Sequence, residues 1–286
     1  MSKNVTIIGG GVIGLAWTRK FLEKGWNVHL NDSQDISAFI EKEFNGKVKF
    51  FHDLAESVKD ADYVQECGPE RLPIKQDIFK ILAQHAPTHA IFASSSSSIV
   101  SSEIAENNPA ADRILIGHPF NPANIMPLVE VVPNPKTSKD TVNTAMQIYS
   151  ELGYEPALIQ KEIAGFVANR LQIAFLNECY YLVEQGIIDA ADLDKLVLNS
   201  LGLRWSTVGP FEGEHLGGGA QGISHLLSGV GSNMNFQLGT PDPTKAHILI
   251  EQTEKAYGVG EENWKKRSEK RDQLTEEILK LRRQTK

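Results

Sequence analysis

The sequence predicts an α/β protein with a Rossmann-type, doubly wound and mostly parallel sheet, followed by a smaller all-α domain. Up to residue 161, short β-type runs alternate with stretches of helical periodicity, as in consecutive βαβ units. After residue 161 the apolar spacing is helical, and little β-type sequence follows. We therefore expect two domains, residues 1–161 and residues 162–286.

The first domain should contain strands that are separated, in most cases, by helices. Two clear helical patterns cover Val12–Lys24 and Leu72–Gln84, and a short helix fits Ile36–Phe44. The predicted strands are Asn4–Gly9, Asn27–Asn31, Lys47–Phe51, Asp62–Glu66, His89–Ala93, Arg113–Gly117, Leu128–Val132 and Glu155–Ile159.

The second domain should be built from helices alone. Apolar residues recur every 3.6 positions over Ile163–Gln185, which predicts one long helix. The last 25 residues carry dense mixed charge, with Leu274, Ile278 and Leu281 as a narrow apolar stripe. This pattern is typical of a surface helix with one packing face.

The composition excludes several functional classes. Of 286 residues, 41% are hydrophobic and 23% charged, as expected for a packed globular protein, and the net charge of −7 does not favour nucleic-acid binding. No apolar run approaches the length of a membrane span, and the N-terminus lacks the features of a secretion signal. The two cysteines form neither a disulfide framework nor a metal site. We therefore expect a cytoplasmic protein with no membrane, nucleic-acid or metal partner.

A glycine-rich loop follows the first predicted strand and opens a helix. Gly9, Gly11 and Gly14 fit the pattern G-x-G-x-x-G, and Val12 and Ile13 fill its last two variable positions. In a dinucleotide site these glycines permit the tight turn, the approach of the pyrophosphate and close helix–strand packing, with the phosphates at the helix N-terminus. The pattern alone is weak, because glycine-rich turns are common, but its strand–loop–helix context favours cofactor binding.

An acidic residue ends the second predicted strand. Asp32 can accept hydrogen bonds from the adenosine ribose hydroxyls, and its charge would repel a 2′-phosphate. Residues 31–34 contain no Arg or Lys that could receive such a phosphate. We therefore expect NAD rather than NADP; the alternative is a solvated acidic residue in a turn.

A histidine and a glutamate form the candidate catalytic pair. His118 comes at the end of a predicted strand, where open α/β sheets bind ligands, and Glu130 interrupts the next aliphatic strand. A buried carboxylate needs a partner, and it could fix the tautomer of a neighbouring imidazole. Taken singly, such a histidine is more often structural, and such a glutamate more often sits at a solvent-facing or edge position.

Six further motifs follow the glycine loop in order. They are QECGPERL (65–72) with Lys75, ASSSSS (93–98), GHPFNP (117–122), PLVEVV (127–132), GFVANRL (165–171) and GPFE (209–212). With these motifs the chain resembles the 3-hydroxyacyl-CoA dehydrogenase family over essentially its whole length. The serine run and the prolines around His118 resemble the branch of L-carnitine dehydrogenase and lambda-crystallin, also known as L-gulonate 3-dehydrogenase.

The resemblance implies a role for each matching residue. His118 would be the general base in oxidation and the general acid in reduction, and Glu130 would orient it. Ser97 and Asn169 would bind the reacting oxygen and its surroundings. Positions on the nicotinamide-ribose side of the NAD site would be Glu70, Lys75 and Asn121. The resemblance also implies a homodimer formed through the helical domain.

The sequence departs from members that use acyl-CoA. Those members carry a long helical hairpin after the second strand, but here the short helix Ile36–Phe44 with one basic residue, Lys42, fills the gap. CoA carries several phosphate charges and needs Lys or Arg. We therefore expect a small free hydroxy acid as substrate. Arg204 could pair with its carboxylate, and Trp205 or Phe211 could face a trimethylammonium group. A surface arginine and a packed aromatic residue are equally good interpretations of these residues.

Three functions follow from these observations. The first is an NAD-dependent dehydrogenase of a small L-3-hydroxy carboxylic acid, with a carnitine-like or gulonate-like substrate. The second is an L-3-hydroxyacyl-CoA dehydrogenase. The third is a non-catalytic, crystallin-like protein that binds NAD(H), which the intact set of Ser97, His118, Glu130 and Asn169 disfavours.

Overall fold

The protein folds into two units in the computed structural model, which describes residues 3–229, 231 and 236–284. The first unit covers Met1–Arg170 and the second Leu171–Lys286. The division thus falls later in the chain than the boundary expected at residue 161. Each unit is described by itself below.

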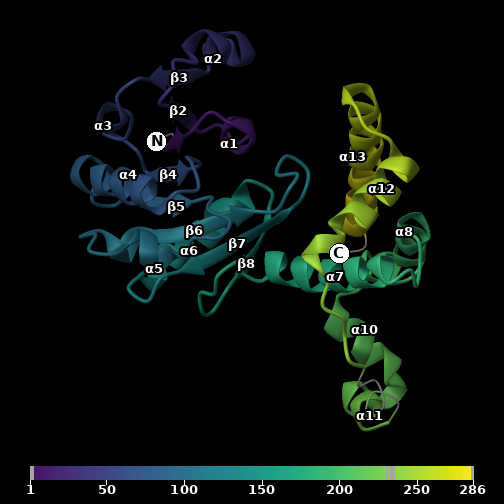
Figure 1. The fold of residues 1–286 in the computed structure, drawn as a ribbon. Coiled ribbons are helices and arrows are strands. Elements are labelled where there is room, and N and C mark those ends of the chain that lie inside the picture. The colour runs from purple at the N-terminus through teal and green to yellow at the C-terminus, as the bar shows by residue number, and fades with distance from the viewer. Residues whose placement is uncertain (1–2, 230, 232–235, 285–286) are drawn as a thin grey trace. The chain divides into compact units, whose positions relative to one another are not determined.

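The first unit contains one eight-stranded sheet with the order β3-β2-β1-β4-β5-β6-β7-β8 (Figure 1). Neighbouring strands are parallel except for β6 and β7, which are antiparallel. All eight predicted strands are present, and the predicted fold class is confirmed. Their bounds are β1 Asn4–Ile8, β2 Asn27–Asn31, β3 Val48–Phe51, β4 Tyr63–Glu66, β5 Ile91–Ser94, β6 Ile114–Pro119, β7 Leu128–Pro133 and β8 Glu155–Leu158.

Helices cover both faces of this sheet. They are α1 Val12–Glu23, α2 Ser37–Phe44, α3 Leu54–Ser57, α4 Leu72–His85, α5 Ser101–Ile104, η1 Ala111–Arg113 and α6 Lys139–Glu151. Side chains alternate between faces along a strand, so Val5 and Ile7 of β1 join the core under α1, α2 and α6, while Ile8 joins the core under α4 and α5. Because the sheet is covered on both faces, most side chains of its central strands are buried, including polar ones such as Gln65 and Glu66 of β4.

The strand order reverses between β1 and β4. The chain leaves β1 through α1 toward β2 on one side, and leaves β4 through α4 toward β5 on the other. In open α/β sheets the crevice at such a point, beyond the carboxyl ends of the strands, binds the ligand. The glycine loop after β1 and residue Cys67 after β4 meet there, with the Cys67 amide donating to the Ile8 carbonyl at 2.7 Å.

The long helix predicted over Ile163–Gln185 starts later than expected. Helix α7 spans Ala168–Glu184, and a turn precedes it in which Gly165 has φ 74° and Phe166 has φ 50°. A left-handed conformation is unusual for a phenylalanine and ends helical continuity. The predicted start was wrong because Phe166 has the apolar spacing of a helix face, whereas its side chain, 0% exposed, packs into the core of the first unit.

Within residues 171–229, 231 and 236–284 the second unit contains helices and no strand, as predicted. After α7 it contains α8 Ala190–Leu198, α9 Leu201–Trp205, α10 Pro210–Gly217, η2 Gly219–Gln221, α11 Ile223–Ser228, η4 Pro243–Lys245, α12 Ala246–Tyr257 and α13 Glu261–Gln284. The expected charged terminal helix is α13, yet its stripe is not packed: Leu274, Ile278 and Leu281 are 50%, 44% and 63% exposed. Among the residues described, no helix is both long and apolar enough to cross a bilayer.

Candidate active site

The glycine loop has the geometry that each glycine position demands. Gly9 has φ 98°, and a Cβ there would lie 2.7 Å from the Cys67 carbonyl oxygen. At Gly14 a Cβ would lie 1.8 Å from the Gly9 carbonyl oxygen, so this position lets α1 pack against the loop. At Gly11 a Cβ would meet nothing within 4 Å. Side chains are thus excluded at Gly9 and Gly14, while Gly11 leaves its backbone open to a ligand.

The N-terminus of α1 is available to an anion. Gly11 precedes the helix without a side-chain cap, and the first turn holds no acidic residue. Val12 is 84% exposed at the start of the helix, whereas Ile13 packs against the core. The uncapped N–H groups and the helix dipole therefore face a region where a pyrophosphate would be stabilised.

Asp32 lies beside this loop at the end of β2. Its Oδ2 accepts from the Gly10 amide at 2.7 Å, and its Oδ1 accepts from the Gln34 amide at 2.8 Å. Each carboxylate oxygen can accept more than one hydrogen bond, so both retain capacity for ribose hydroxyls. The aspartate thus couples the glycine loop to the predicted adenosine-ribose position.

Asp32→Asn should lower kcat/KM for NAD about 10- to 100-fold, since a hydrogen bond to a charged group is worth roughly 1.5–3 kcal/mol. The same variant should raise the ratio of NADP to NAD efficiency, because the charge that repels a 2′-phosphate is gone. Initial rates with both coenzymes test this. Asp35→Asn is the matched control, since the hydrogen bonds of this nearby carboxylate in the described part of the chain come from Ser37 alone. An unchanged coenzyme ratio in Asp32→Asn would remove Asp32 from ribose recognition.

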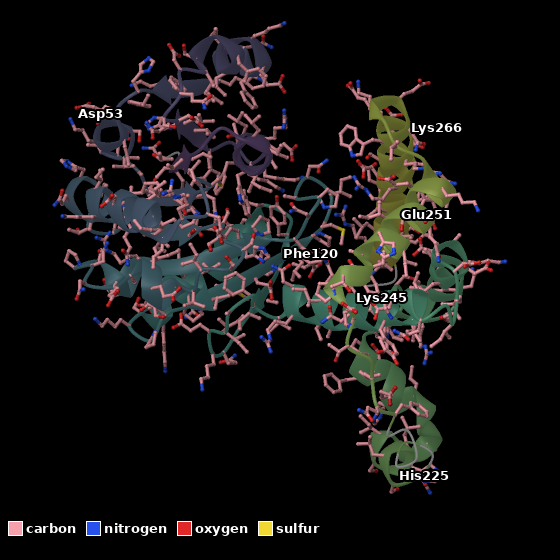
Figure 2. The ribbon with its side chains drawn as sticks, viewed as in Figure 1. Asp53, Phe120, His225, Lys245, Glu251 and Lys266 are labelled. Carbon is pink, nitrogen blue, oxygen red and sulfur yellow. The ribbon has the colours of Figure 1, made fainter. Side chains whose placement is uncertain are left out.

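His118 and Glu130 face each other across two antiparallel strands. They are register partners on β6 and β7, and His118 Nδ1 lies 3.0 Å from Glu130 Oε2. Both are buried, with 5% and 2% exposure, and the imidazole lies 5.3 Å from the Phe166 ring, centroid to centroid. Figure 2 labels Phe120, the first residue after β6, and so marks the end of the strand that carries His118.

The second oxygen of Glu130 holds the start of α7. Oε1 accepts from the amides of Val167 and Ala168 at 2.9 and 3.0 Å. Burial alone would raise the pKa of Glu130, but the hydrogen bonds from His118, Ala168 and Val167 outweigh it, so the pKa lies below its ordinary value. Glu130 is therefore an anion that accepts at both oxygens. In the neutral imidazole the proton therefore belongs on Nδ1, which faces this carboxylate, and the lone pair lies on Nε2.

Asn169 connects α7 to the serine run. Its Nδ2 donates to the Ser97 carbonyl oxygen at 3.3 Å. Ser97 is exposed, and its hydroxyl has no hydrogen-bond partner among the residues described. The turn at Gly165 and Phe166 thus brings two predicted substrate-binding residues, Ser97 and Asn169, together in the first unit.

Glu70 holds the serine run in shape. Its Oε1 accepts from the Ser96 hydroxyl at 2.7 Å, from the Ser97 amide at 3.0 Å, and from the Ser98 amide and hydroxyl, both at 2.9 Å. Burial raises its pKa, but these bonds and the charge of Lys75 lower it below the ordinary value. The run is thus an ordered loop, not a linker.

Glu66, at the end of β4, is a buried charge whose importance the sequence did not reveal. Both of its oxygens lie 2.9 Å from Lys75 Nζ, and it also accepts from the Gly68 amide and the Ser94 hydroxyl at 2.6 and 2.5 Å. Lys75 is 1% exposed, and its ammonium lies 3.5 Å from Glu70. A direct contact between Lys75 and NAD stays a prediction. The sequence signal that could have revealed this ion pair is an acidic residue at the end of a strand, Glu66, with a lysine nine positions later.

The remaining predicted residues are Asn121, Arg204 and Trp205. Asn121 is exposed in the loop after β6, three residues beyond His118. Arg204 and Trp205 end α9 in the second unit, where Trp205 packs edge-on against Phe175 at 6.3 Å. The role of Asn121 toward NAD and the roles of Arg204 and Trp205 toward substrate stay predictions.

Comparison with known proteins adds independent information. The description "3-hydroxyacyl-CoA dehydrogenase, NAD binding domain" matches residues 38–163, and "3-hydroxyacyl-CoA dehydrogenase, C-terminal domain" matches residues 165–257. A 3-hydroxyacyl-CoA dehydrogenase of Gibberella moniliformis is 40% identical over 80% of this chain and 77% of its own length. An L-carnitine dehydrogenase of Bacillus cereus is 31% identical over 98% of this chain and 92% of its own.

A solved structure shares the whole fold. The 5-formyl-3-hydroxy-2-methylpyridine 4-carboxylic acid 5-dehydrogenase, an NAD⁺-dependent dismutase, has a TM-score of 0.82 at 23% identity and covers 99% of both chains. The matches to the NAD-binding and C-terminal domains of the family confirm the family resemblance and the prediction of NAD as cofactor. The glycine loop and Asp32 precede the matched residues, so their assignment depends on the geometry above. By its matched domains and its relatives, the chain belongs to the 3-hydroxyacyl-CoA dehydrogenase family.

Proposed function

We propose that this protein is an NAD-dependent dehydrogenase that interconverts a small, free L-3-hydroxy carboxylic acid and its 3-keto acid. The observation that carries the proposal is the buried pair of His118 and Glu130, in which the carboxylate lies 3.0 Å from Nδ1 and leaves Nε2 as the ring nitrogen available to a substrate. This pair lies in the same unit as the glycine loop, with His118 near the carboxyl end of β6 and Glu130 opposite it on the antiparallel strand β7.

The proposed chemistry assigns one task to each group. His118 Nε2 accepts the hydroxyl proton of the substrate, and bound NAD⁺ would supply the acceptor for the hydride on the same carbon, so that the products would be the ketone and NADH. Glu130 stabilises the imidazolium that forms. The hydroxyl of Ser97 and the amide of Asn169 donate to the oxygen as its negative charge develops. In the reverse direction the imidazolium returns the proton.

The segment between β2 and β3 supports a free acid over a CoA thioester. It contains only α2, of eight residues, in which Lys42 lies between Glu41 and Glu43. Glu43 also pairs with Arg19 at 2.6 Å, so that neighbouring cation is already neutralised. A CoA thioester remains the second candidate because one relative, 40% identical, is named a 3-hydroxyacyl-CoA dehydrogenase.

A substrate screen tests the proposal. Purified protein with NAD⁺ should reduce the coenzyme, measured at 340 nm, with at least one free 3-hydroxy acid from a panel that includes L-carnitine and L-gulonate. Turnover of 3-hydroxybutyryl-CoA should be far slower. Faster turnover of the thioester than of every free acid would establish the second candidate. Binding of NADH without turnover of any compound would support a non-catalytic, crystallin-like role.

Arg204 is proposed to bind the substrate carboxylate. It is exposed at the end of α9 and has no ion-pair partner among the described residues. Arg204→Ala should raise KM for a carboxylate substrate about 10- to 100-fold, as expected for a charge-assisted hydrogen bond worth roughly 1.5–3 kcal/mol. Steady-state kinetics with the acid and its methyl ester measure this. An equal effect on both would refute carboxylate pairing.

We further propose a homodimer formed through the helical unit. The surface of this unit exposes several large apolar side chains. An open apolar cavity of about 600 Å³ is lined by α7 and α8 together with Leu201 and Leu238. Among the exposed residues are Leu196, Leu198, Leu203 and Phe211. Exposed apolar patches of this kind mark interaction surfaces. Light scattering after size exclusion should give twice the chain mass; a monomer would contradict the proposal.

A further inference from the structure

A glutamine beneath the active site joins three elements. Gln65 is 0% exposed in β4, and its Nε2 donates to Ser95 Oγ at 2.8 Å and to the Gly117 carbonyl at 3.3 Å. Its Oε1 accepts from the Tyr149 hydroxyl at 2.8 Å. Strand β5 lies between β4 and β6, and the register partner of Gln65 on β5 is Ala93. This small residue lets the amide reach across the intervening strand.

The surrounding residues are shaped to this arrangement. A Cβ at Gly117 would lie 1.7 Å from the Tyr149 hydroxyl oxygen, so only glycine fits there. Tyr149 in turn accepts from the Tyr63 hydroxyl at 2.8 Å. Burial raises the pKa of both tyrosines, so both hydroxyls keep their protons and act as donors.

Ser95 is the junction of the network. Trp17 Nε1 of α1 donates to Ser95 Oγ at 3.1 Å, and Cys67 Sγ lies 3.4 Å from the same oxygen. The indole can only donate and the Gly117 carbonyl can only accept, so the donor end of the Gln65 amide must point toward Ser95 and Gly117. Both lone pairs of Ser95 are then used, and its proton is directed to Cys67.

No polar side-chain atom of this network is left unpaired, as holds for all buried side-chain atoms in the part of the chain that the structure describes. Buried networks that are fully satisfied fix one geometry, because every broken bond leaves a polar group without water. The network therefore specifies the distance between the elements that it connects.

We propose that Gln65 is a positioning residue for the reaction. Ser95 is the first residue after β5 and leads into the serine loop, while Gly117 directly precedes His118. The Gln65 side chain thus sets the separation between the serine loop and His118. Trp17, which donates to Ser95, connects helix α1 to the same network. The catalytic part of this inference rests on the function proposed above.

Gln65→Met tests the role, since methionine has a similar length but no hydrogen bonds. Its kcat should fall about 10- to 100-fold, because a displacement of about 1 Å between reacting groups has effects of this size. The dissociation constant of NADH, measured by fluorescence, should change less than about threefold, because the glycine loop keeps its own contacts. Amide hydrogen exchange in segments 95–98 and 117–121 should become faster.

Tyr63→Phe is the matched control. It removes a buried hydroxyl from the far end of the same network but leaves every bond of Gln65 in place. The control should lose thermal stability, yet it should keep kcat within about twofold of the wild type, because the spacing of Ser95 and Gly117 is untouched. If Gln65→Met does not fold, Ser95→Ala takes its place, with the same expected loss of kcat.

Two outcomes would overturn the inference: a kcat for Gln65→Met or Ser95→Ala within twofold of the wild type, or an equal loss of kcat in Tyr63→Phe. If the wild type oxidises no hydroxy acid, the proposed function fails, and hydrogen exchange still decides the positioning role. Faster exchange in both segments of Gln65→Met, and in neither segment of Tyr63→Phe, supports it. Unchanged exchange in Gln65→Met contradicts it.

Discussion

His118→Gln should lower kcat for oxidation of the substrate by roughly 10²–10⁴-fold, the usual contribution of a general base. Glutamine can still donate to Glu130, so the strand pairing and the start of α7 should persist. It offers no group that takes up a proton near neutral pH. The dissociation constant of NADH should stay within about threefold of the wild type, because the loss concerns the chemical step alone.

The exposed histidine His89 supplies the control. It is 65% exposed at its side chain, precedes β5 and pairs with Asp62 at 3.0 Å, at the end of the sheet away from the candidate site. His89→Gln should leave kcat within a factor of about two, as is usual for surface substitutions. If His118→Gln turned over substrate as fast as His89→Gln, His118 would not be the base.

Glu130→Gln should lower kcat on the order of 10³-fold, by reversing the imidazole tautomer rather than by removing the base. The amides of Val167 and Ala168 require an oxygen, so the new NH₂ group must face His118 Nδ1. Nδ1 then has to accept, and the proton moves to Nε2, where it blocks the lone pair that catalysis needs. Steady-state rates test the size of the loss, and ¹⁵N NMR of the imidazole tests the tautomer.

The same variant has a stability signature that depends on pH. The folded pKa of Glu130 lies below its ordinary value of 4.5, so its ionised form stabilises the folded state at neutral pH. This contribution is complete above the unfolded pKa and is lost as pH falls through the lowered folded pKa. The difference in unfolding free energy between wild type and Glu130→Gln should therefore be large at pH 7 and shrink below pH 4.5. Urea titrations that give the same difference in unfolding free energy at pH 7 and at pH 3.5 would contradict this expectation.

Strands and the cofactor loop were predictable because their signals are local. An aliphatic run of four to six residues between turns has few alternatives to a buried parallel strand, and the spacing of Gly9, Gly11 and Gly14 encodes contacts made within one βα unit. The contact between His118 and Glu130 could be predicted by assuming only that consecutive strands are neighbours in the sheet, and β6 and β7 are neighbours.

The start of α7 and the buried ion pair could not be read from the sequence, because distant residues determine them. Phe166 adopts φ 50° since its ring fills the core and the following amides reach Glu130, a residue far away in the chain. Helical periodicity cannot report such a constraint. Likewise, Lys75 has the spacing of a solvated helix residue, and only the packing of α4 against β4 brings its ammonium to Glu66.

The most direct test of the account is a crystal structure of the protein with NAD⁺ and a 3-keto acid. We expect the keto oxygen within about 2.6–3.2 Å of His118 Nε2, and the keto carbon about 3–3.5 Å from C4 of the nicotinamide ring. Ser97 and Asn169 should donate to that oxygen. A nicotinamide bound where no substrate could bridge its C4 and His118 would contradict the central claim, whatever the kinetics of the variants.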